Sequence, residues 1–251
     1  MLDMLTLGWP DLNPRAISMD YEKGLMNAFE AYFPAAEIHG CFFHLVQNVK
    51  KHVAAAGLTS RYRKEADFAL SVRMIPTLAF LPPHRLEDGL RDLRAHPPQE
   101  LRPILNYFED NYMGRLQQGN NGHLERREVV FPVTMWSVHA RTLAGDSRTN
   151  NYVEAFHRSV QRQFSVEHPS LLAFIDGIRA AQHVKDSQLE RYIAGNAAAE
   201  KRNKYVKNDK RIKTILDDLP NRTITEFLRG IAHTFRMNAR PNEPDSDDAE
   251  E

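Results

Sequence analysis

Residues 148–164 hold the densest group of side chains that could take part in chemistry, in the order RTNNYVEAFHRSVQRQF. The run starts with polar residues and continues with the spacing of a helix, on which residues three and four apart share a face. The side chains that would line this face are those of Asn150, Asn151, Glu154, His157, Arg158 and Gln161. A carboxylate, amides, an imidazole and a guanidinium together suit metal ions and phosphates. Taken alone, the spacing from Asn151 to Glu154 favours a capping box instead.

Asp20 is the second candidate, because it follows an expected strand at 15–19 and precedes an expected helix at 21–32. In open α/β sheets the carboxyl ends of the strands face the crevice where ligands bind. The alternative is that Asp20 caps the helix, a role in which aspartate is common. Together with Glu154, Asp20 would offer hard oxygen ligands to Mg²⁺ or Mn²⁺. Two such ions polarise a phosphodiester and activate water or a 3′-hydroxyl.

Cys41 and His44 lie where a second expected strand, at 37–41, passes into an expected helix at 42–55. Zinc sites need four ligands, and Cys41 is the only cysteine in the chain. The residues therefore favour a buried thiol and a hydrogen-bonding imidazole that brace the strand end, rather than a metal site. The sequence contains no Walker loop, HExxH, GxSxG or GxGxxG motif, which argues against the reaction classes that depend on them.

The elements that would position these residues begin with an α/β unit. Strand, helix, strand and helix follow one another between residues 15 and 55, a pattern that predicts a parallel pair of strands. From 58 to 145 the pattern is helical and interrupted by prolines, with a polar loop at 114–127 and weak strand alternation at 128–135. The helices expected in this block cover 61–74, 83–95 and 98–112.

A basic stretch follows the central helix. His168-Pro-Ser starts a further helix from Leu171 to Lys185 and beyond, and a last helix at 223–235 would be capped by Thr223 or Thr225. Between 185 and 213 there are nine bases against four acids. The stretch could follow a phosphate backbone or form a solvated helix face, and its sequence leaves both open. Its candidate DNA contacts are Lys201, Arg202, Lys204, Lys207, Lys210 and Arg211, with Arg158 on the central helix.

The composition is that of a soluble globular protein, with 251 residues, 42% hydrophobic and 26% charged. The formal net charge is zero, but the last ten residues carry six acids, so the remainder has 33 bases against 27 acids. This excess permits a polyanionic partner. No apolar run is long enough to span a membrane, the start lacks the pattern of a signal peptide, and a single cysteine suits a reducing compartment.

Taken in order, these pieces resemble the Mutator-like element (MULE) transposase domain. The resemblance covers roughly residues 1–185 and rests on SMDYEKGLMNAFEAYFPAAEIHGCFFHLVQNV, then RTNNYVEAFHRSVQRQF followed by HPSLLAFIDGI. It implies a ribonuclease H-like core with an Asp–Asp–Glu triad, in which Asp20 is the second Asp and Glu154 the Glu. Cys41 and His44 match the Cys-x-x-His of the family, and Asn150, Asn151 and His157 match its TNNxxExxH-like stretch. It further implies Mg²⁺ or Mn²⁺, transposon-end and target DNA as partners, a nuclear location and assembly into homo-oligomers.

The first Asp of the family has no counterpart on a core strand here, because only Asp3 and Asp11 precede Asp20. Asp3 falls in an expected helix and Asp11 in a loop. Two carboxylates would hold a metal pair poorly, and positioning supplies much of the catalysis in phosphoryl transfer. We therefore expect little or no strand transfer by this chain alone.

The expected fold is α/β, a partial ribonuclease H-like core of short parallel strands and helices with a large all-helical insertion, mostly helical overall. The expected parts are a partial core at 1–57, the insertion at 58–145, the Glu-bearing helix and its successor at 146–185, a basic helical region at 186–240 and an acidic disordered tail at 241–251. The expected function is that of a DDE-transposase fragment, inactive alone. The alternatives are a non-enzymatic transposase derivative that binds DNA or protein, and a helical interaction protein unconnected with nucleic acid.

Overall fold

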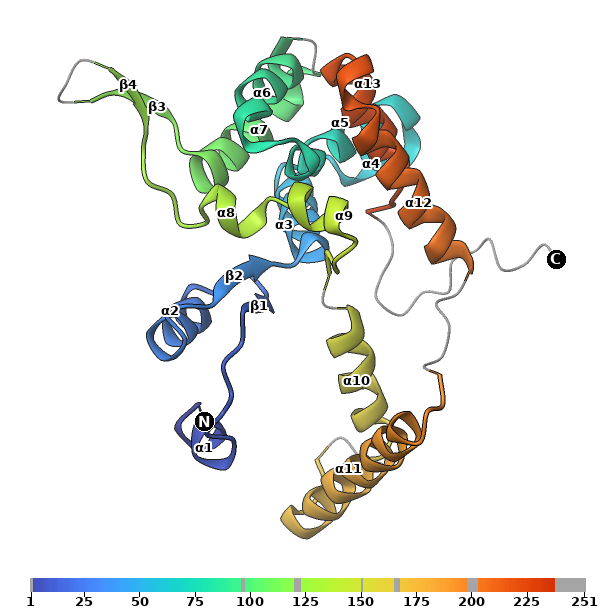
Figure 1. Ribbon diagram of the computed structural model, residues 1–251. Helices are drawn as coiled ribbons and strands as arrows, with labels where there is room; N and C mark the ends of the chain where they lie inside the picture. Colours follow the sequence, from blue (N-terminus) through green and yellow to red (C-terminus); the bar gives the residue numbers. More distant parts are fainter. Residues whose placement is uncertain are drawn as a thin grey trace. The chain divides into compact units, whose positions relative to one another are not determined.

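The computed structural model describes residues 2–95, 98–119, 123–149, 151–164, 168–197 and 203–237. The chain divides into two compact units. Figure 1 labels their helices and strands, coloured along the sequence. Unit 1 consists of Met1–Thr149 and Asn208–Glu251, and unit 2 of Asn150–Lys207. The described residues are mostly helical, with two small two-stranded sheets. The expected acidic tail at 241–251 lies outside the described residues.

Unit 1 begins with the predicted α/β element. Strands β1 and β2 pair in parallel, from Ala16 opposite Glu37 to Met19 opposite Gly40, which confirms the predicted parallel pair. The backbone of Cys41 continues the ladder by donating to the Met19 carbonyl at 3.0 Å. The elements are α1 (Leu2–Gly8), β1 (Ala16–Met19), α2 (Lys23–Tyr32), β2 (Glu37–Gly40) and α3 (Phe42–Ala55).

A block of short helices follows α3. The single helix expected at 61–74 is instead two, because Glu65 adopts an extended conformation with φ −113° and ψ 107° between them. The prolines also shorten the other helices, since Pro76, Pro83 and Pro98 each stand at a helix start. The elements are α4 (Thr59–Lys64), α5 (Ala66–Met74), η1 (Pro76–Phe80), η2 (Pro83–Arg85), α6 (Leu86–Ala95), η3 (Gln99–Leu101), α7 (Arg102–Phe108) and the π-helical turn η4 (Glu109–Met113).

The polar loop expected at 114–127 is wrong, because this segment forms an antiparallel hairpin of β3 (Leu116–Gln118) and β4 (Leu124–Arg126). Its strands are three residues long and largely exposed, so they lack the apolar alternation that marks a strand in a sequence. The weak strand expected at 128–135 is also wrong. Pro132 precedes a helical turn there, α8 (Val133–Trp136), which buries Met135 and Trp136.

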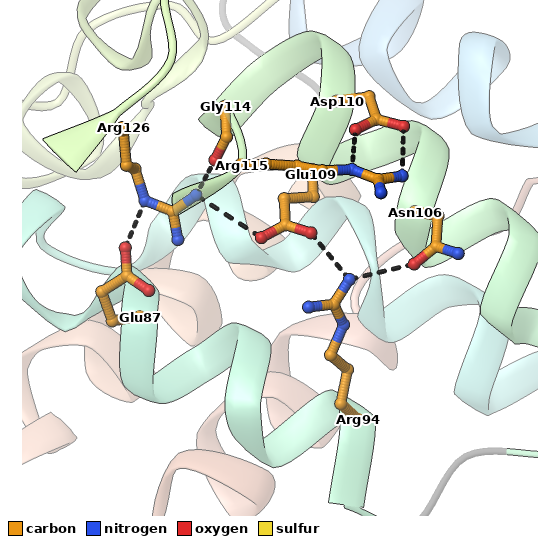
Figure 2. A network of polar contacts seen from close by, with 8 residues as sticks. All are labelled: Glu87, Arg94, Asn106, Glu109, Asp110, Gly114, Arg115 and Arg126. Carbon is orange, nitrogen blue, oxygen red and sulfur yellow. Dashed lines mark hydrogen bonds and ion pairs between the residues drawn. The ribbon is translucent and has the colours of Figure 1, made fainter. Parts of the chain in front are cut away.

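An ion-pair network joins the hairpin to the helices, as Figure 2 shows. Its centre is Glu109, a buried carboxylate that meets Arg94 at 2.7 Å and Arg126 of β4 at 3.6 Å. Arg126 also contacts Glu87 of α6 and donates to the carbonyl of Gly114. The hairpin is therefore fixed at its base by charge-assisted hydrogen bonds, which are stronger than neutral ones.

The remaining helices of unit 1 close the helical block. The structure decides between the two proposed caps of the last helix, because Thr223 forms a capping box with Glu226. Helix α13 packs against α5, α6 and η1, so this helix lies on the block of short helices that follows α3. The elements are α9 (His139–Ala144), α12 (Asn203–Asp217, which enters unit 1 at Asn208), η5 (Leu219–Asn221) and α13 (Ile224–Ala232).

Aromatic side chains form the centre of the core in unit 1. Tyr112 and Trp136 are fully buried, and the indole N–H donates to the Tyr112 carbonyl at 2.7 Å. Phe108 packs against both rings. Tyr21, which follows β1, meets Tyr112 edge to face with ring centroids 5.7 Å apart. The α/β element therefore shares its packing with the helical block.

Unit 2 contains α10 (Asn151–Gln161) and α11 (Leu171–Ile193). These helices confirm the two predicted from 148–164 and from Leu171 onward. Ser170 caps α11 by accepting from the backbone N–H of Ala173. Phe164, just after α10, stacks on Phe174 of α11 with ring centroids 5.6 Å apart. This stacking holds the end of α10 against the first turns of α11.

Candidate functional site

Asp20 directly follows the last residue of β1, at the carboxyl edge of the parallel pair. It is not the cap of α2, because that helix begins at Lys23 and its N-cap is Glu22. The Asp20 carboxylate lies 2.8 Å from Nδ1 of His44, on the first turn of α3. Both side chains are partly exposed, at 43% for Asp20 and 27% for His44. The structure thus brings together two of the residues predicted for the site, at the edge where α/β sheets bind ligands.

Cys41 lies between these elements and is fully buried. The next residue, Phe42, donates its backbone N–H to the carbonyl of Arg148 at 2.9 Å. The Arg148 guanidinium in turn contacts Asp209 of α12 at 2.6 Å. The segment that leads to α10 is therefore held by its backbone at the start of α3, next to the sheet edge that bears Asp20, and by the Arg148 side chain against α12. The sequence predicted candidate site residues in both segments, but not the contacts of Arg148 with Phe42 and Asp209.

Tyr21 and Arg141 form a buried polar layer behind this edge, which sequence reasoning missed. Arg141 of α9 is 8% exposed and donates from Nη2 to the carbonyls of Gly40, at 3.2 Å, and Ser137, at 3.3 Å. Burial lowers the pKa of Arg141, but a guanidinium stays charged in proteins. Burial likewise raises the pKa of Tyr21, so its hydroxyl stays protonated near neutral pH. A single arginine on a short helix gives no sequence signal for this role.

Gly40 is expected to be the least replaceable residue at this edge. A Cβ there would lie 2.6 Å from the Tyr21 hydroxyl and 2.7 Å from its ring, so the ring must move. Gly40→Ala is expected to lower the free energy of unfolding by about 1–3 kcal/mol, the usual cost of overpacking. Gly24→Ala is the matched control, since a Cβ at this exposed helical position meets nothing within 4 Å. It should be stabilising by about 0.5–1 kcal/mol in urea denaturation. Equal effects of the two substitutions would contradict this account of Gly40.

The residues predicted on α10 are only partly described. Asn150 lies outside the described residues, as do the side chains of Asn151 and Glu154, although α10 includes both in its backbone. His157 and Arg158 are exposed or partly exposed on α10. Asp20 and Glu154 belong to different units, so their separation stays a prediction.

The metal site also stays a prediction. Among the residues that the structure describes, no three His, Cys, Asp or Glu side chains are grouped so that they could hold a metal ion. Asp20 with His44 offers one carboxylate, whereas Mg²⁺ prefers oxygen ligands and a two-ion site needs bridging carboxylates. The described residues by themselves therefore do not make up a complete Mg²⁺ or Mn²⁺ site. Cys41 and His44 belong to no such group either.

The predicted DNA contacts gather on α12. Lys204, Lys207 and Arg211 are exposed and spaced three and four residues apart, so they share one helix face. Lys210 is exposed beside them. Asp209, the acid among them, contacts Arg148 instead, and Lys201 and Arg202 lie outside the described residues. The face is thus positively charged, and the carboxylate within it, Asp209, is paired with Arg148.

An apolar groove runs between α10 and α11 in unit 2. Its volume is about 410 Å³. Phe156, Val160 and Phe164 form one wall. Phe174, Ile178 and Ala181 form the other. His157, one of the residues predicted for the site, is among those that line the groove.

Comparisons with protein-family models, with curated proteins and with solved structures found no match. The likeness to the MULE transposase domain therefore rests on the residues already described. Within the described part of the chain, no helix combines the length and the apolar character needed to cross a membrane.

Proposed function

We propose that this chain is a piece of a DDE-type transposase core that binds DNA through the basic face of α12 and does not transfer strands by itself. The observation that carries the DNA binding is the exposed row of Lys204, Lys207, Lys210 and Arg211. A helix presenting successive bases can neutralise successive phosphates, and the released counterions favour binding. The partner is duplex DNA, and the expected location is the nucleus.

The transposase origin is supported by the carboxyl edge of the parallel strands. Asp20 directly follows β1, His44 contacts it at 2.8 Å, and the Arg148 carbonyl accepts from the backbone of Phe42 at the start of α3. Glu154 follows Arg148 by six residues, so chain connectivity alone limits their Cα separation to about 20 Å. Asp20, His44 and Glu154 are among the residues on which the resemblance depends, and the fold proposed with it is a partial ribonuclease H-like core with a helical insertion.

The expected lack of strand transfer is argued from Asp20. Its carboxylate contacts the imidazole of His44 at 2.8 Å, whereas phosphoryl transfer depends on the precise positioning of two ions by carboxylates. Purified chain with Mg²⁺ or Mn²⁺ and duplex DNA is expected to give no cleavage products above those of Asp20→Ala. Robust cleavage that Asp20→Ala abolishes would refute this part of the proposal.

DNA binding is tested by the salt dependence of affinity. The variant Lys207→Ala/Lys210→Ala/Arg211→Ala is expected to weaken binding to duplex DNA in fluorescence anisotropy, and to reduce the slope of log K against log salt by about 2.7 for three lost phosphate contacts. The matched control removes the same charge from exposed positions elsewhere, Lys51→Ala/Arg63→Ala/Lys64→Ala. It should keep most of the original slope. A native chain without salt-dependent binding, or equal losses in both variants, would sink the proposal and favour a helical interaction protein.

A further inference from the structure

The last described residues of the chain are held beside α12. Asn208 of α12 donates from its side-chain amide to the carbonyl of Thr234 at 3.2 Å, just after the end of α13. Phe235 packs edge to face on Phe42, with ring centroids 5.4 Å apart, and Met237 is 1% exposed. The chain that follows Met237 therefore starts from a fixed position in unit 1, a few residues after a contact with α12.

This contact lies next to the α12 basic face, the exposed row of Lys204, Lys207, Lys210 and Arg211. Lys204 stands four residues before Asn208, and Arg211 three residues after it. On a helix such residues are neighbours, with Cβ atoms about 5–6 Å apart. Asn208 is itself partly buried, so Thr234 reaches α12 at the border of the basic face.

The bases of this face differ in their partners from other bases of unit 1. Arg94 and Arg115, for example, contact carboxylates. Among the residues that the structure describes, no ion pair involves Lys207, Lys210 or Arg211. These three positive charges lie within about 6 Å along the helix axis and repel one another, so an anionic partner would stabilise them.

The acidic segment 243–251 can supply such a partner within the chain. It carries six acids and no base: Glu243, Asp245, Asp247, Asp248, Glu250 and Glu251. Glu243 follows Thr234 by nine residues, which span up to about 30 Å. The α12 basic face, from Lys204 to Arg211, is about 10 Å long. The acids can therefore reach every base of the face from the point where Thr234 contacts α12.

We propose that the acidic segment docks on the α12 basic face and competes there with DNA, an inference that rests on the proposed DNA binding. Single exposed ion pairs contribute little to binding. Tethering, however, gives the segment an effective concentration in the millimolar range, so several weak pairs together keep it docked. DNA carries one charge per about 1.7 Å and displaces the segment when it is in excess. The segment thus lowers the affinity for DNA without abolishing it.

A spin label on the segment tests the docking in the absence of DNA. The label is attached to the full chain through Ala249→Cys, since the native Cys41 is fully buried. In two-dimensional NMR it is expected to broaden the backbone amide signals of residues 204–211 at low salt. This broadening should fall at about 1 M salt, where the Debye length is only about 3 Å.

The matched control has the same label and the same length but no charge on the segment. This neutral-segment variant combines Glu243→Gln, Asp245→Asn, Asp247→Asn, Asp248→Asn, Glu250→Gln and Glu251→Gln. It should lose most of the broadening on α12, because its segment stays near α12 only through the tether. Equal broadening in the two chains overturns the proposal, as does stronger broadening of α4 than of α12.

Fluorescence anisotropy tests the competition with DNA. If the segment covers the face in about four-fifths of the molecules, the neutral-segment variant should bind duplex DNA about fivefold more tightly than the native chain. The gain should fall below about twofold when Lys207→Ala/Lys210→Ala/Arg211→Ala is also present, because the two changes then act on one contact. It should persist with the matched control for that triple variant. An equal gain in both cases indicates general repulsion between the segment and DNA and overturns the proposal.

The outcomes also separate this inference from the proposed function. A native chain that binds no DNA refutes the proposed function, and the labelled chains then decide whether the segment docks. A chain that binds DNA through α12 but gains no affinity in the neutral-segment variant keeps the proposed function and overturns the inference.

Discussion

Glu109→Ala is expected to lower the free energy of unfolding by about 3–5 kcal/mol, the usual cost of removing one partner from a buried ion pair. Glu109 is 7% exposed and stands between Arg94 at 2.7 Å and Arg126 at 3.6 Å (Figure 2). Its loss removes the carboxylate that both guanidinium groups contact. Arg126 is the more affected, because its side chain is 21% exposed and its Nη2 atom has no hydrogen-bond partner among the described residues.

The matched control for Glu109 is Glu87→Ala, which removes another carboxylate that contacts Arg126. The Glu87 side chain is 48% exposed, so water can replace it, and the expected loss is below about 1 kcal/mol. Urea denaturation followed by circular dichroism gives both values from the midpoints. If the two substitutions cost the same, Glu109 does not hold the hairpin, and the hairpin and helices are joined by packing alone.

Regular elements near the start of the chain could be predicted because local signals agree there. Helix α3 has the predicted bounds, since its buried residues Phe42, Val46, Val49 and Val53 repeat at helical spacing between Cys41 and Gly57. The parallel pair followed from strand–helix–strand order alone. The prediction failed for β3 and β4, because these strands are short and polar and show no apolar alternation. It also failed for α8, because apolar alternation at 128–135 indicated a strand where the structure has a single helical turn.

Candidate site residues could be predicted from the sequence only where they lie at the end of an expected strand. Asp20 and His44 follow strand ends, and the structure places them in contact. Arg141 is distant in sequence from Gly40, to which it donates, and only the folded chain relates them. Glu109 follows the buried Phe108 and begins the π-helical turn η4, where the next residue, Asp110, is exposed, so the sequence fits a solvent-exposed helix position equally well. Contacts of charged side chains between residues far apart in the chain could therefore not be predicted from the sequence.

Trp136→Ala is expected to be as destabilising as Glu109→Ala, at about 3–5 kcal/mol, for a different reason. Trp136 is the largest fully buried side chain and packs edge to face on Phe108, with ring centroids 5.4 Å apart. Its removal opens a cavity and also leaves the Tyr112 carbonyl without the indole N–H that donates to it at 2.7 Å. Tyr112 also packs against Tyr21, the residue after Asp20, so the substitution is expected to disturb the packing next to Asp20 as well.

Trp136→Phe separates the two costs, because it keeps an aromatic ring in the cluster but removes the indole N–H. An unsatisfied buried carbonyl costs about 1–3 kcal/mol, so this variant should lose less than half as much as the alanine variant if the cavity dominates. Thermal and urea unfolding of both variants, with Trp9→Phe as the exposed control, measures the difference. Equal losses for phenylalanine and alanine would assign the energy to the hydrogen bond. The position of Tyr112 would then depend on one donor rather than on the packing of its ring.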